Sequence, residues 1–385
     1  MGVGVRAGTR YSSSVRDCGE SMFSETIKLL TGVAAISLFA IAPAQAAAKY
    51  HFKLGHVISA GTPIDIAANR LADLVRQRTN GEVEIKVYPA SQLGGERAII
   101  EGVQLGTIEM SFTTTGAIGG FAPEFHVLDL PFLFQSYEAA YTYLDGAQGS
   151  KLLKLLDRKG IHGLVYLENG WRNFTTSKNP IKLPGDMKGQ KIRVMESPMY
   201  MGLIRALNGS PTPMAYSELP NALLQKVIDG QENPTVNIYS ARMYESQPYM
   251  IKDQHTYNVF IFKVNGKVWK ALPENIRKTI ETIAVEVRDF QRKLNREADA
   301  TFVKRLEGKG MKVHVPSKEE AKAWQTATAP LWEEAKKIAT PALVAEAAQY
   351  RTDWEAGKYK AEEQKYIENF KTISVPLDDV MKNFK

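Results

Sequence analysis

The stretch YHFKLGH, residues 50–56, opens the part of the chain that decides the fold. Its apolar side chains alternate with polar ones, which is the period of a half-buried β-strand, and the glycine marks a turn. A helical pattern follows at 63–75, and the alternation returns at 82–88. We expect a second helix at 98–105 and a third strand at 106–112. This succession of strand, helix and strand predicts an α/β fold with a parallel sheet.

Polar residues stand where the predicted strands of this region end. His56 follows the first strand, Glu96 lies in the loop after the second, and Thr114 follows the third. Because parallel α/β sheets bind ligands at the carboxyl ends of their strands, all three are candidate ligand contacts. Each could instead be a solvated loop residue, since loops expose many polar groups that bind nothing.

Two arginines in polar surroundings indicate a site for an anion. Arg172 follows a predicted strand at 161–167, which we expect to end at residues 168–170. Arg193 lies in the short predicted strand KIRV, residues 191–194, and points away from the apolar side chains beside it. A guanidinium group is always charged and offers a planar fork of donors, which suits a carboxylate. The alternative for each arginine is a structural salt bridge.

The length of the chain, 385 residues, predicts two domains. We expect the chain to leave the first lobe near Trp171 and to return near Asn258. The expected division is lobe I, residues 47–170 and 258–297, and lobe II, residues 171–257 and 298–385. An apolar face that continues from Pro273 to Gly308 predicts one helix of about 50 Å, long enough to run along both lobes. The tail after residue 317 should be mostly helical.

The N-terminal residues have the pattern of an export signal. Lys28 precedes an apolar run at 29–42, and residues 44–46, Ala-Gln-Ala, match a cleavage site. We therefore expect residues 1–46, an upstream extension and signal peptide, to be removed. A membrane anchor is the alternative, but the run is shorter than the roughly 20 residues that span a bilayer. The single cysteine, Cys18, falls in the removed part, so the mature protein should lack disulfides and reside in the periplasm.

Composition argues against several classes of function. The net charge is +7, but basic residues are mixed with acidic ones and form no stripe with aromatic residues, so we expect no nucleic-acid binding. The sequence has no nucleophile elbow, no His-Glu-x-x-His and no cluster of metal ligands among its six histidines. We therefore predict no catalytic residue, no metal and no cofactor. After signal removal, no segment is apolar enough to span a membrane.

Several short motifs occur in an order that resembles a known family. They are Gln92-Leu93-Gly94, Arg172, MKGQKIRV at 187–194, SPTPM at 210–214 and DGQENP at 229–234. Together they are similar to the DctP-type solute-binding proteins of tripartite ATP-independent periplasmic (TRAP) transporters, over nearly all of the mature chain. The resemblance implies a two-lobed periplasmic binding protein of the type II-like kind, with hinge crossings between its lobes. It also implies a small organic acid as ligand and TRAP membrane subunits as partners.

The resemblance also assigns roles to particular residues. Arg193 matches the family's arginine that makes the paired contact to the ligand carboxylate. Arg172 and Asn233 match residues that assist it, and Tyr216 matches an aromatic that lines the cleft. The sialic-acid branch of the family carries a glutamate and an arginine where Thr114 and Ala117 stand here, so we expect a smaller acid. C4-dicarboxylates, sugar or hydroxy acids and small sulfonates all stay open.

Glu196 lies three residues after Arg193, near the expected carboxylate site. There it would repel a second ligand carboxylate and accept a hydrogen bond from a hydroxyl or amine. The alternative is that Glu196 pairs with a lysine or arginine.

For the whole protein we favour a monomeric carrier that is not an enzyme. The alternative is a periplasmic hydrolase or lyase with Glu96 or Glu196 as its base and Arg193 as anion holder.

Overall fold

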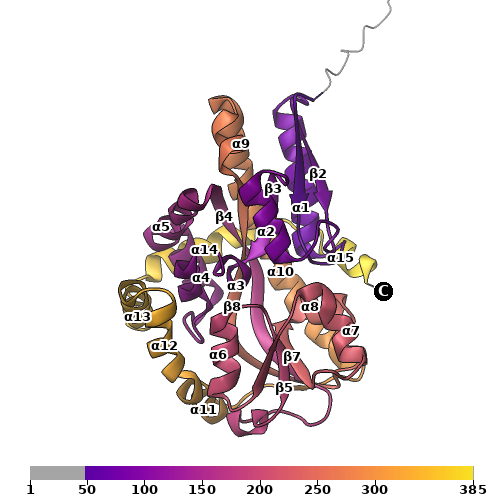
Figure 1. Ribbon diagram of the computed structural model, residues 1–385, viewed down its shortest axis with the longest axis vertical. Coiled ribbons are helices and arrows are strands. Elements are labelled where there is room, and N and C mark those ends of the chain that lie inside the picture. The colour runs from indigo at the N-terminus through magenta and orange to yellow at the C-terminus, as the bar shows by residue number, and fades with distance from the viewer. Residues whose placement is uncertain (1–47, 385) are drawn as a thin grey trace, which may run out of the picture. The chain divides into compact units, whose positions relative to one another are not determined.

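The computed structural model describes residues 48–384 (Figure 1). The expected signal peptide, its cleavage site and the mature start at Ala47 lie outside these residues. Within 48–384, no helix combines the length and the apolar character that crossing a membrane requires. The predicted α/β class is confirmed, because helices cover a sheet of nine strands.

The strands are β1 (Tyr50–Gly55), β2 (Val83–Tyr88), β3 (Met110–Thr114), β4 (Ile161–Thr176), β5 (Lys191–Val194), β6 (Ser210–Pro213), β7 (Gly230–Pro234), β8 (Tyr249–Asn265) and β9 (Lys312–His314). They form one sheet in the order β2-β1-β3-β8-β4-β7-β5-β6, with β9 paired to β8. The pairs of β1 with β2 and β3 are parallel, as predicted, and so are the pairs of β5 with β6 and β7. Each end of the sheet is therefore a parallel α/β unit.

Two long strands, β4 and β8, connect these units. They pair antiparallel from Ile161 opposite Asn265 to Thr176 opposite Tyr249. β3 joins the later part of β8, whereas β7 joins the later part of β4. Register shifts interrupt the β4–β8 pairing on both sides of Gly170. The prediction that residues 168–170 end the strand is therefore wrong. The polar residues there form a bulge, and β4 continues because β8 supplies partners beyond it.

The helices of the β2-β1-β3 half cover both faces of the sheet. They are α1 (Pro63–Arg78), α2 (Glu96–Leu105), α3 (Thr115–Ile118), η1 (Pro123–Asp129), α4 (Tyr137–Asp145), α5 (Ala147–Leu155), η2 (Leu156–Lys159) and α9 (Gly266–Ala271). α1 packs against β2, while α2 packs against β3 and β8. The other half contains η3 (Pro184–Met187), α6 (Pro198–Ala206), η4 (Tyr216–Glu218), α7 (Leu219–Leu224), α8 (Thr235–Ser240) and η5 (Met243–Glu245).

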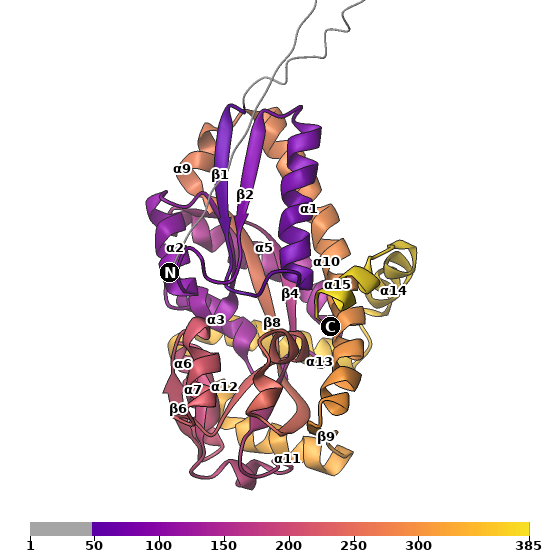
Figure 2. The ribbon, with the colours of Figure 1, turned by 90° about the vertical axis from the view of Figure 1, so that its right-hand side faces the viewer.

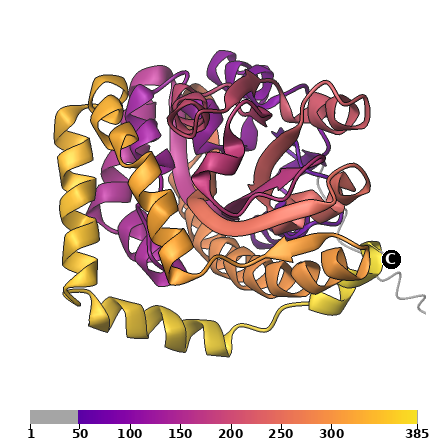
Figure 3. The same ribbon diagram turned by 90° about the horizontal axis from the view of Figure 1, so that it is seen from below.

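The predicted long helix is α10 (Glu274–Gly308), of 35 residues. Its apolar face is buried against α1 and β4 in one half and against α8 and β9 in the other, so it lies along both lobes, as Figure 2 shows. The tail is helical, as expected: α11 (Lys318–Thr328), α12 (Pro330–Ile338), α13 (Pro341–Glu355), α14 (Lys360–Thr372) and α15 (Leu377–Asn383). Figure 3 shows these helices on the outside of the fold, where α12 contacts α6 and α14 contacts α4.

Candidate ligand-binding site

Arg193 lies inside β5, and its side chain is buried on the face opposite to that of Ile192 and Val194. Its Nε and Nη2 donate hydrogen bonds to the backbone oxygen of Met214, at 3.1 and 2.8 Å. Its Nη1 is buried and has no hydrogen-bond partner among the described residues. Burial lowers the pKa of Arg193 to about 10, a shift that Glu232 opposes and Arg172 increases. At neutral pH the group is therefore a buried cation whose Nη1 can still donate hydrogen bonds.

Arg172 is a second buried arginine, and a carboxylate engages it. Its Nε and Nη2 donate to the two carboxylate oxygens of Glu232, the Nη2 bond being 2.8 Å long, and Nη2 also donates to the Glu232 backbone oxygen at 2.6 Å. Burial alone would lower the pKa of Arg172, but the ion pair with Glu232 outweighs it and raises that pKa. The guanidinium also lies 5.3 Å from the ring centre of Tyr200. The charge of Arg172 is thus largely balanced within the protein.

Behind this pair lies a buried histidine. His255 Nε2 is 3.3 Å from Glu232 Oε2, and His255 Nδ1 is 2.8 Å from Asp253 Oδ2. Burial would lower the pKa of His255, but the two carboxylates outweigh it and raise the pKa to about 9. Burial likewise acts to raise the pKa of Glu232, yet Arg172 and His255 hold it below the usual value. Positive and negative groups therefore alternate from Asp253 to Arg172, and this holds the Arg172 fork in place.

Glu96 is the first residue of α2 and faces the arginines from the other half of the sheet. The amide and hydroxyl of Thr114 donate to its two carboxylate oxygens, at 2.6 and 2.9 Å. Burial raises the pKa of Glu96, whereas these hydrogen bonds and the cations Lys263 and Arg193 partly offset the rise. Thr114 therefore holds Glu96, and its own hydroxyl is already in use.

The predicted site residues mostly come together. Six of them line one small cavity of about 10 Å³: Glu96, Thr114, Arg172, Arg193, Tyr216 and Asn233. That volume is about what one water molecule needs. The Tyr216 hydroxyl is buried with no hydrogen-bond partner among residues 48–384. The amide of Asn233 donates to Gln231 Oε1 at 2.6 Å. Several polar groups thus converge on one small space.

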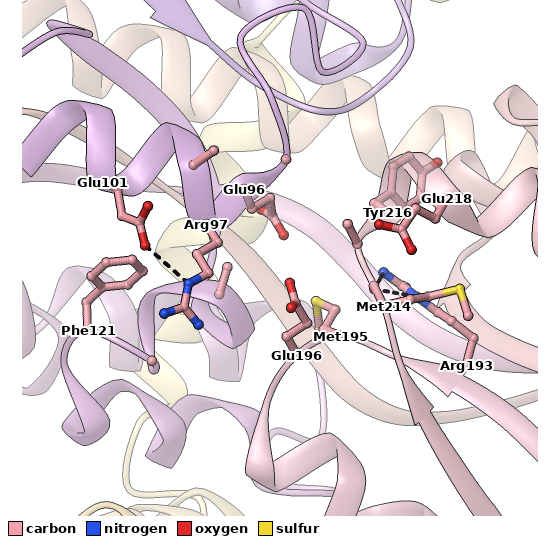
Figure 4. A pocket seen from close by; sticks show the side chains of 15 residues that line it. Glu96, Arg97, Glu101, Phe121, Arg193, Met195, Glu196, Met214, Tyr216 and Glu218 are labelled. Carbon is pink, nitrogen blue, oxygen red and sulfur yellow. Dashed lines mark hydrogen bonds and ion pairs between the residues drawn. The ribbon is translucent and has the colours of Figure 1, made fainter.

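A wider pocket of about 320 Å³ opens beside the small cavity and shares Glu96, Arg193, Met195 and Tyr216 with it. Figure 4 shows Glu96 on one side of this pocket and Glu196 and Arg193 on the other. Glu196 is exposed, and no described lysine or arginine lies within salt-bridge distance of it. Its position at the pocket is therefore open to a ligand.

His56 is the one predicted site residue that lines neither space. Its side chain is completely buried, and Nε2 lies 3.2 Å from Asp65 Oδ1 at the start of α1. His56 follows β1 as predicted, but its ring contacts α1. Its neighbours Val57 and Ile58 reach the cavity instead.

Some residues of the cavity were not predicted from the sequence. Asn169 lines it and donates to Asn258 Oδ1 at 2.8 Å, although residues 168–170 had only suggested the end of a strand. Asn237 lies in α8, the helix that directly follows the strand of Asn233, and its donor bond to Asn169 Oδ1 at 2.9 Å places it at the cavity. The roles of Glu232 and His255 depend on pairing across strands, so no local pattern indicated them. Within residues 48–384, no group of three His, Cys, Asp or Glu side chains could hold a metal ion.

Comparison with known proteins gives consistent matches. The family model for bacterial extracellular solute-binding protein, family 7, named DctP, matches residues 54–338. The 2,3-diketo-L-gulonate-binding periplasmic protein YiaO of Escherichia coli is 34% identical over 74% of this chain and 85% of that protein. The C4-dicarboxylate-binding periplasmic protein DctP of Rhodobacter capsulatus is 32% identical over 82% of this chain and 95% of that protein.

A solved structure agrees with the fold. The sugar acid binding protein DctPAm of Advenella mimigardefordensis, in complex with galactonate, is 32% identical and has a TM-score of 0.78, covering 80% of this chain and 99% of that one. The predicted resemblance is thereby confirmed. The two-lobed sheet, the buried arginines at its centre and these matches lead to one conclusion: the chain belongs to the DctP family, the bacterial extracellular solute-binding proteins of family 7.

Proposed function

We propose that this protein captures a small hydroxy or sugar acid with one carboxylate in the periplasm and delivers it to TRAP membrane subunits. The lobes would close over the acid, with its carboxylate on Arg193 and its hydroxyls toward Glu96. In this proposal the protein acts as a monomer, carries out no chemical reaction on the acid and binds no nucleic acid.

One observation carries the proposal: Arg193 is a buried cation whose Nη1 has no partner among the described residues. An unpaired buried charge is costly unless something satisfies it. A carboxylate can accept from Nη1 and from the remaining N–H of Nη2, which gives two parallel hydrogen bonds. The Tyr216 hydroxyl, also buried without a partner, lines the same cavity and could donate to the same anion.

The balance of charge supports an acid with a single carboxylate. Glu232 neutralises Arg172, so Arg193 is the cation left for the ligand among the residues that line the small cavity. The other charged group there is Glu96, and Glu196 follows at the wider pocket. A second ligand carboxylate would meet these two negative groups, whereas hydroxyls would find acceptors. Galactonate, bound by the Advenella protein, has one carboxylate and several hydroxyls.

A C4-dicarboxylate is the second candidate, because Arg97 also lines the wider pocket. Arg97 is exposed and paired with Glu101 at 3.2 Å, so it offers a weak counter-charge. The Rhodobacter relative is named for C4-dicarboxylate binding. Competition between a hydroxy acid and a C4-dicarboxylate for binding to the protein distinguishes the two candidate ligands.

The test is calorimetry with galactonate, D-erythronate and succinate on the parent and on Arg193→Lys. Lysine keeps the charge but lacks the fork, so hydroxy-acid affinity should fall roughly 10- to 150-fold, the equivalent of one lost hydrogen bond to a charged group. Arg172→Lys should weaken affinity less. Arg205→Lys, the same change at an exposed position of α6, is the control and should bind as the parent does. Equal affinity of Arg193→Lys and the parent would refute the carboxylate clamp.

The variant Glu96→Gln tests the ligand class. It removes the negative charge and keeps the size, so hydroxy acids should bind less tightly and the preference over succinate should shrink. If the parent prefers succinate instead, the monocarboxylate assignment is wrong.

Incubation of each bound acid with the protein, followed by chromatography, checks for turnover. Light scattering measures the oligomeric state, and uptake should stop in a strain that lacks the membrane subunits.

A further inference from the structure

Lys263 is a buried lysine in β8 that no described carboxylate pairs with. Its side chain is completely buried. Its Nζ donates to the backbone oxygens of Ile261 and Thr113, at 3.2 and 3.4 Å, and no described carboxylate oxygen lies within salt-bridge distance. Burying an ammonium group is costly, and an apolar residue would fill a strand position in a core more cheaply. The position therefore calls for a functional explanation.

The backbone of β3 connects Lys263 to Glu96. Lys263 stands opposite Ser111 in the β3–β8 pairing, so the two side chains share a face of the sheet with Thr113, two residues further along β3. The hydroxyls of Ser111 and Thr113 are both buried without a hydrogen-bond partner among the described residues. Thr114 comes next and holds Glu96 through two hydrogen bonds. The carbonyl of the Thr113–Thr114 peptide group accepts from Lys263 Nζ, and its amide donates to Glu96, so the lysine and the glutamate bind the same peptide group.

Lys263 and Glu96 influence each other's charge. Burial lowers the pKa of Lys263 to about 7, and Glu96 is the charged group that opposes this shift. Burial raises the pKa of Glu96, and of the two cations that counteract it, Lys263 has a stronger effect than Arg193. After the two hydrogen bonds from Thr114, the group that most favours the ionised form of Glu96 is therefore this lysine and not the arginine assigned to the ligand.

We propose that Lys263 is a positioning residue for ligand specificity: its ammonium group keeps Glu96 a carboxylate, so that the cleft accepts hydroxyl donors and rejects a second carboxylate. The inference rests on the proposed function and deepens it. A protonated Glu96 would have an O–H to donate and would no longer repel an anion. With Lys263 in place, Arg193 is free to serve the ligand, because it is not needed to hold Glu96 ionised.

The first test replaces Lys263 by Met, which has a similar unbranched length and no charge. Loss of the nearby cation should raise the pKa of Glu96 further, read from the carboxyl ¹³C signal that Glu96→Gln identifies. Galactonate should bind about tenfold more weakly, whereas succinate should lose less affinity or gain some. Lys270→Met, at an exposed position of α9, should leave both the pKa of Glu96 and the preference unchanged.

The double variant Lys263→Met/Glu96→Gln separates a role through Glu96 from a merely structural one. If the lysine acts through Glu96, the double variant should show the same acid preference as Glu96→Gln alone. If the losses of galactonate affinity in the two single variants add up in the double variant, the proposal is wrong. If Lys263→Met retains both the galactonate preference and the parent pKa of Glu96 while Arg193→Lys still abolishes tight binding, this inference fails and the proposed function stands.

A measurement on proteins that keep Lys263 covers the case in which the Met variant does not fold. In ¹³C-lysine-labelled parent protein, the Lys263 Cε signal should titrate near pH 7, apart from the exposed lysines. In Glu96→Gln the same signal should titrate at lower pH, because the carboxylate that favours the charged amine is gone. An unchanged titration would show that the two groups are not coupled and would overturn the proposal.

Discussion

At the scale of single residues, the two buried arginines have opposite roles. Arg172 donates to Glu232, which His255 and Asp253 support from behind, so its charge is satisfied inside the protein. Arg193 has only a neutral carbonyl as partner and keeps its Nη1 free among the described residues. Arg172 is therefore part of the lining of the site, and Arg193 supplies the charge that an anion needs.

His255 should make stability depend on pH. Its folded pKa, about 9, lies above the ordinary value of 6.5. Its contribution to the free energy of unfolding is thus fully present below pH 6.5 and is lost as pH rises through 9, by up to about 3 kcal/mol. In His255→Gln the difference in unfolding free energy from the parent should therefore shrink between pH 6.5 and 9.

The measurement is urea unfolding of both proteins at several pH values in this range. The difference between them matters, because Lys263 acts in the opposite direction: its folded pKa is lowered to about 7, so its contribution to stability rises with pH. Lys263 is present in both proteins, and its effect cancels. A difference that stays constant from pH 6.5 to 9 would mean that His255 is not charged in the fold.

At the scale of elements, the site depends on the bulge in β4. Glu168 within it accepts hydrogen bonds from the hydroxyls of Tyr141 and Tyr257 and from the amide of Asn295 on α10. Gly170 has φ +118°, a conformation that other residues rarely adopt. The bulge places Arg172 directly after this point, so the aim of its side chain depends on the backbone there.

Gly170→Ala should therefore destabilise the protein more than an ordinary glycine substitution. The added Cβ would lie 3.3 Å from Asn295 Nδ2 and 3.4 Å from Pro234 Cβ, and the strained backbone alone costs about 1 to 3 kcal/mol. Gly189→Ala is the matched control, with φ +74° and no atom near its Cβ within 4 Å. Equal losses of unfolding free energy in the two variants would show that the bulge imposes no special constraint.

At the scale of the whole molecule, we propose that the lobes meet where β4 and β8 cross at Gly170 and Asn258, which are opposite each other in register. The lobe boundaries predicted from the sequence run through these positions. Tyr200 of α6 donates to Asp129 Oδ1 of η1 at 3.4 Å and accepts from Asn258 at 3.1 Å, so the halves are in contact behind the site. The small cavity of about 10 Å³ cannot hold an organic acid, so we propose that the acid enters by the wider pocket and that the lobes separate to let it reach Arg172 and Asn233.

The radius of gyration should consequently fall when a ligand binds. X-ray scattering with and without saturating galactonate should show the smaller value in the bound protein. Arg193→Lys at the same galactonate concentration is the control and should stay closer to the unliganded value. No change in the parent at saturation would argue against hinge closure.

The α/β class, the long helix, the family and the convergence of Arg172, Arg193 and Glu96 could be predicted from the sequence by itself. The reason is that alternation, helical periodicity and turn residues act over a few neighbouring positions. Three of the family motifs cover the short strands β5, β6 and β7 and residues beside them, so each can be recognised from a few consecutive positions. The ring of His56 was the exception, because its direction depends on Asp65 in the following helix.

Only the tertiary structure decided which charges are satisfied. The pairing of Arg172 with Glu232, which are 60 positions apart, depends on the antiparallel register of β4 with β7. The contact of His255 with Glu232 depends in addition on the register of β4 with β8. Burial of Lys263 depends on the pairing of β8 with β3 in the same way. Such contacts are set by the packing of distant strands, and a charged residue alone does not reveal whether its partner will be a protein group or a ligand.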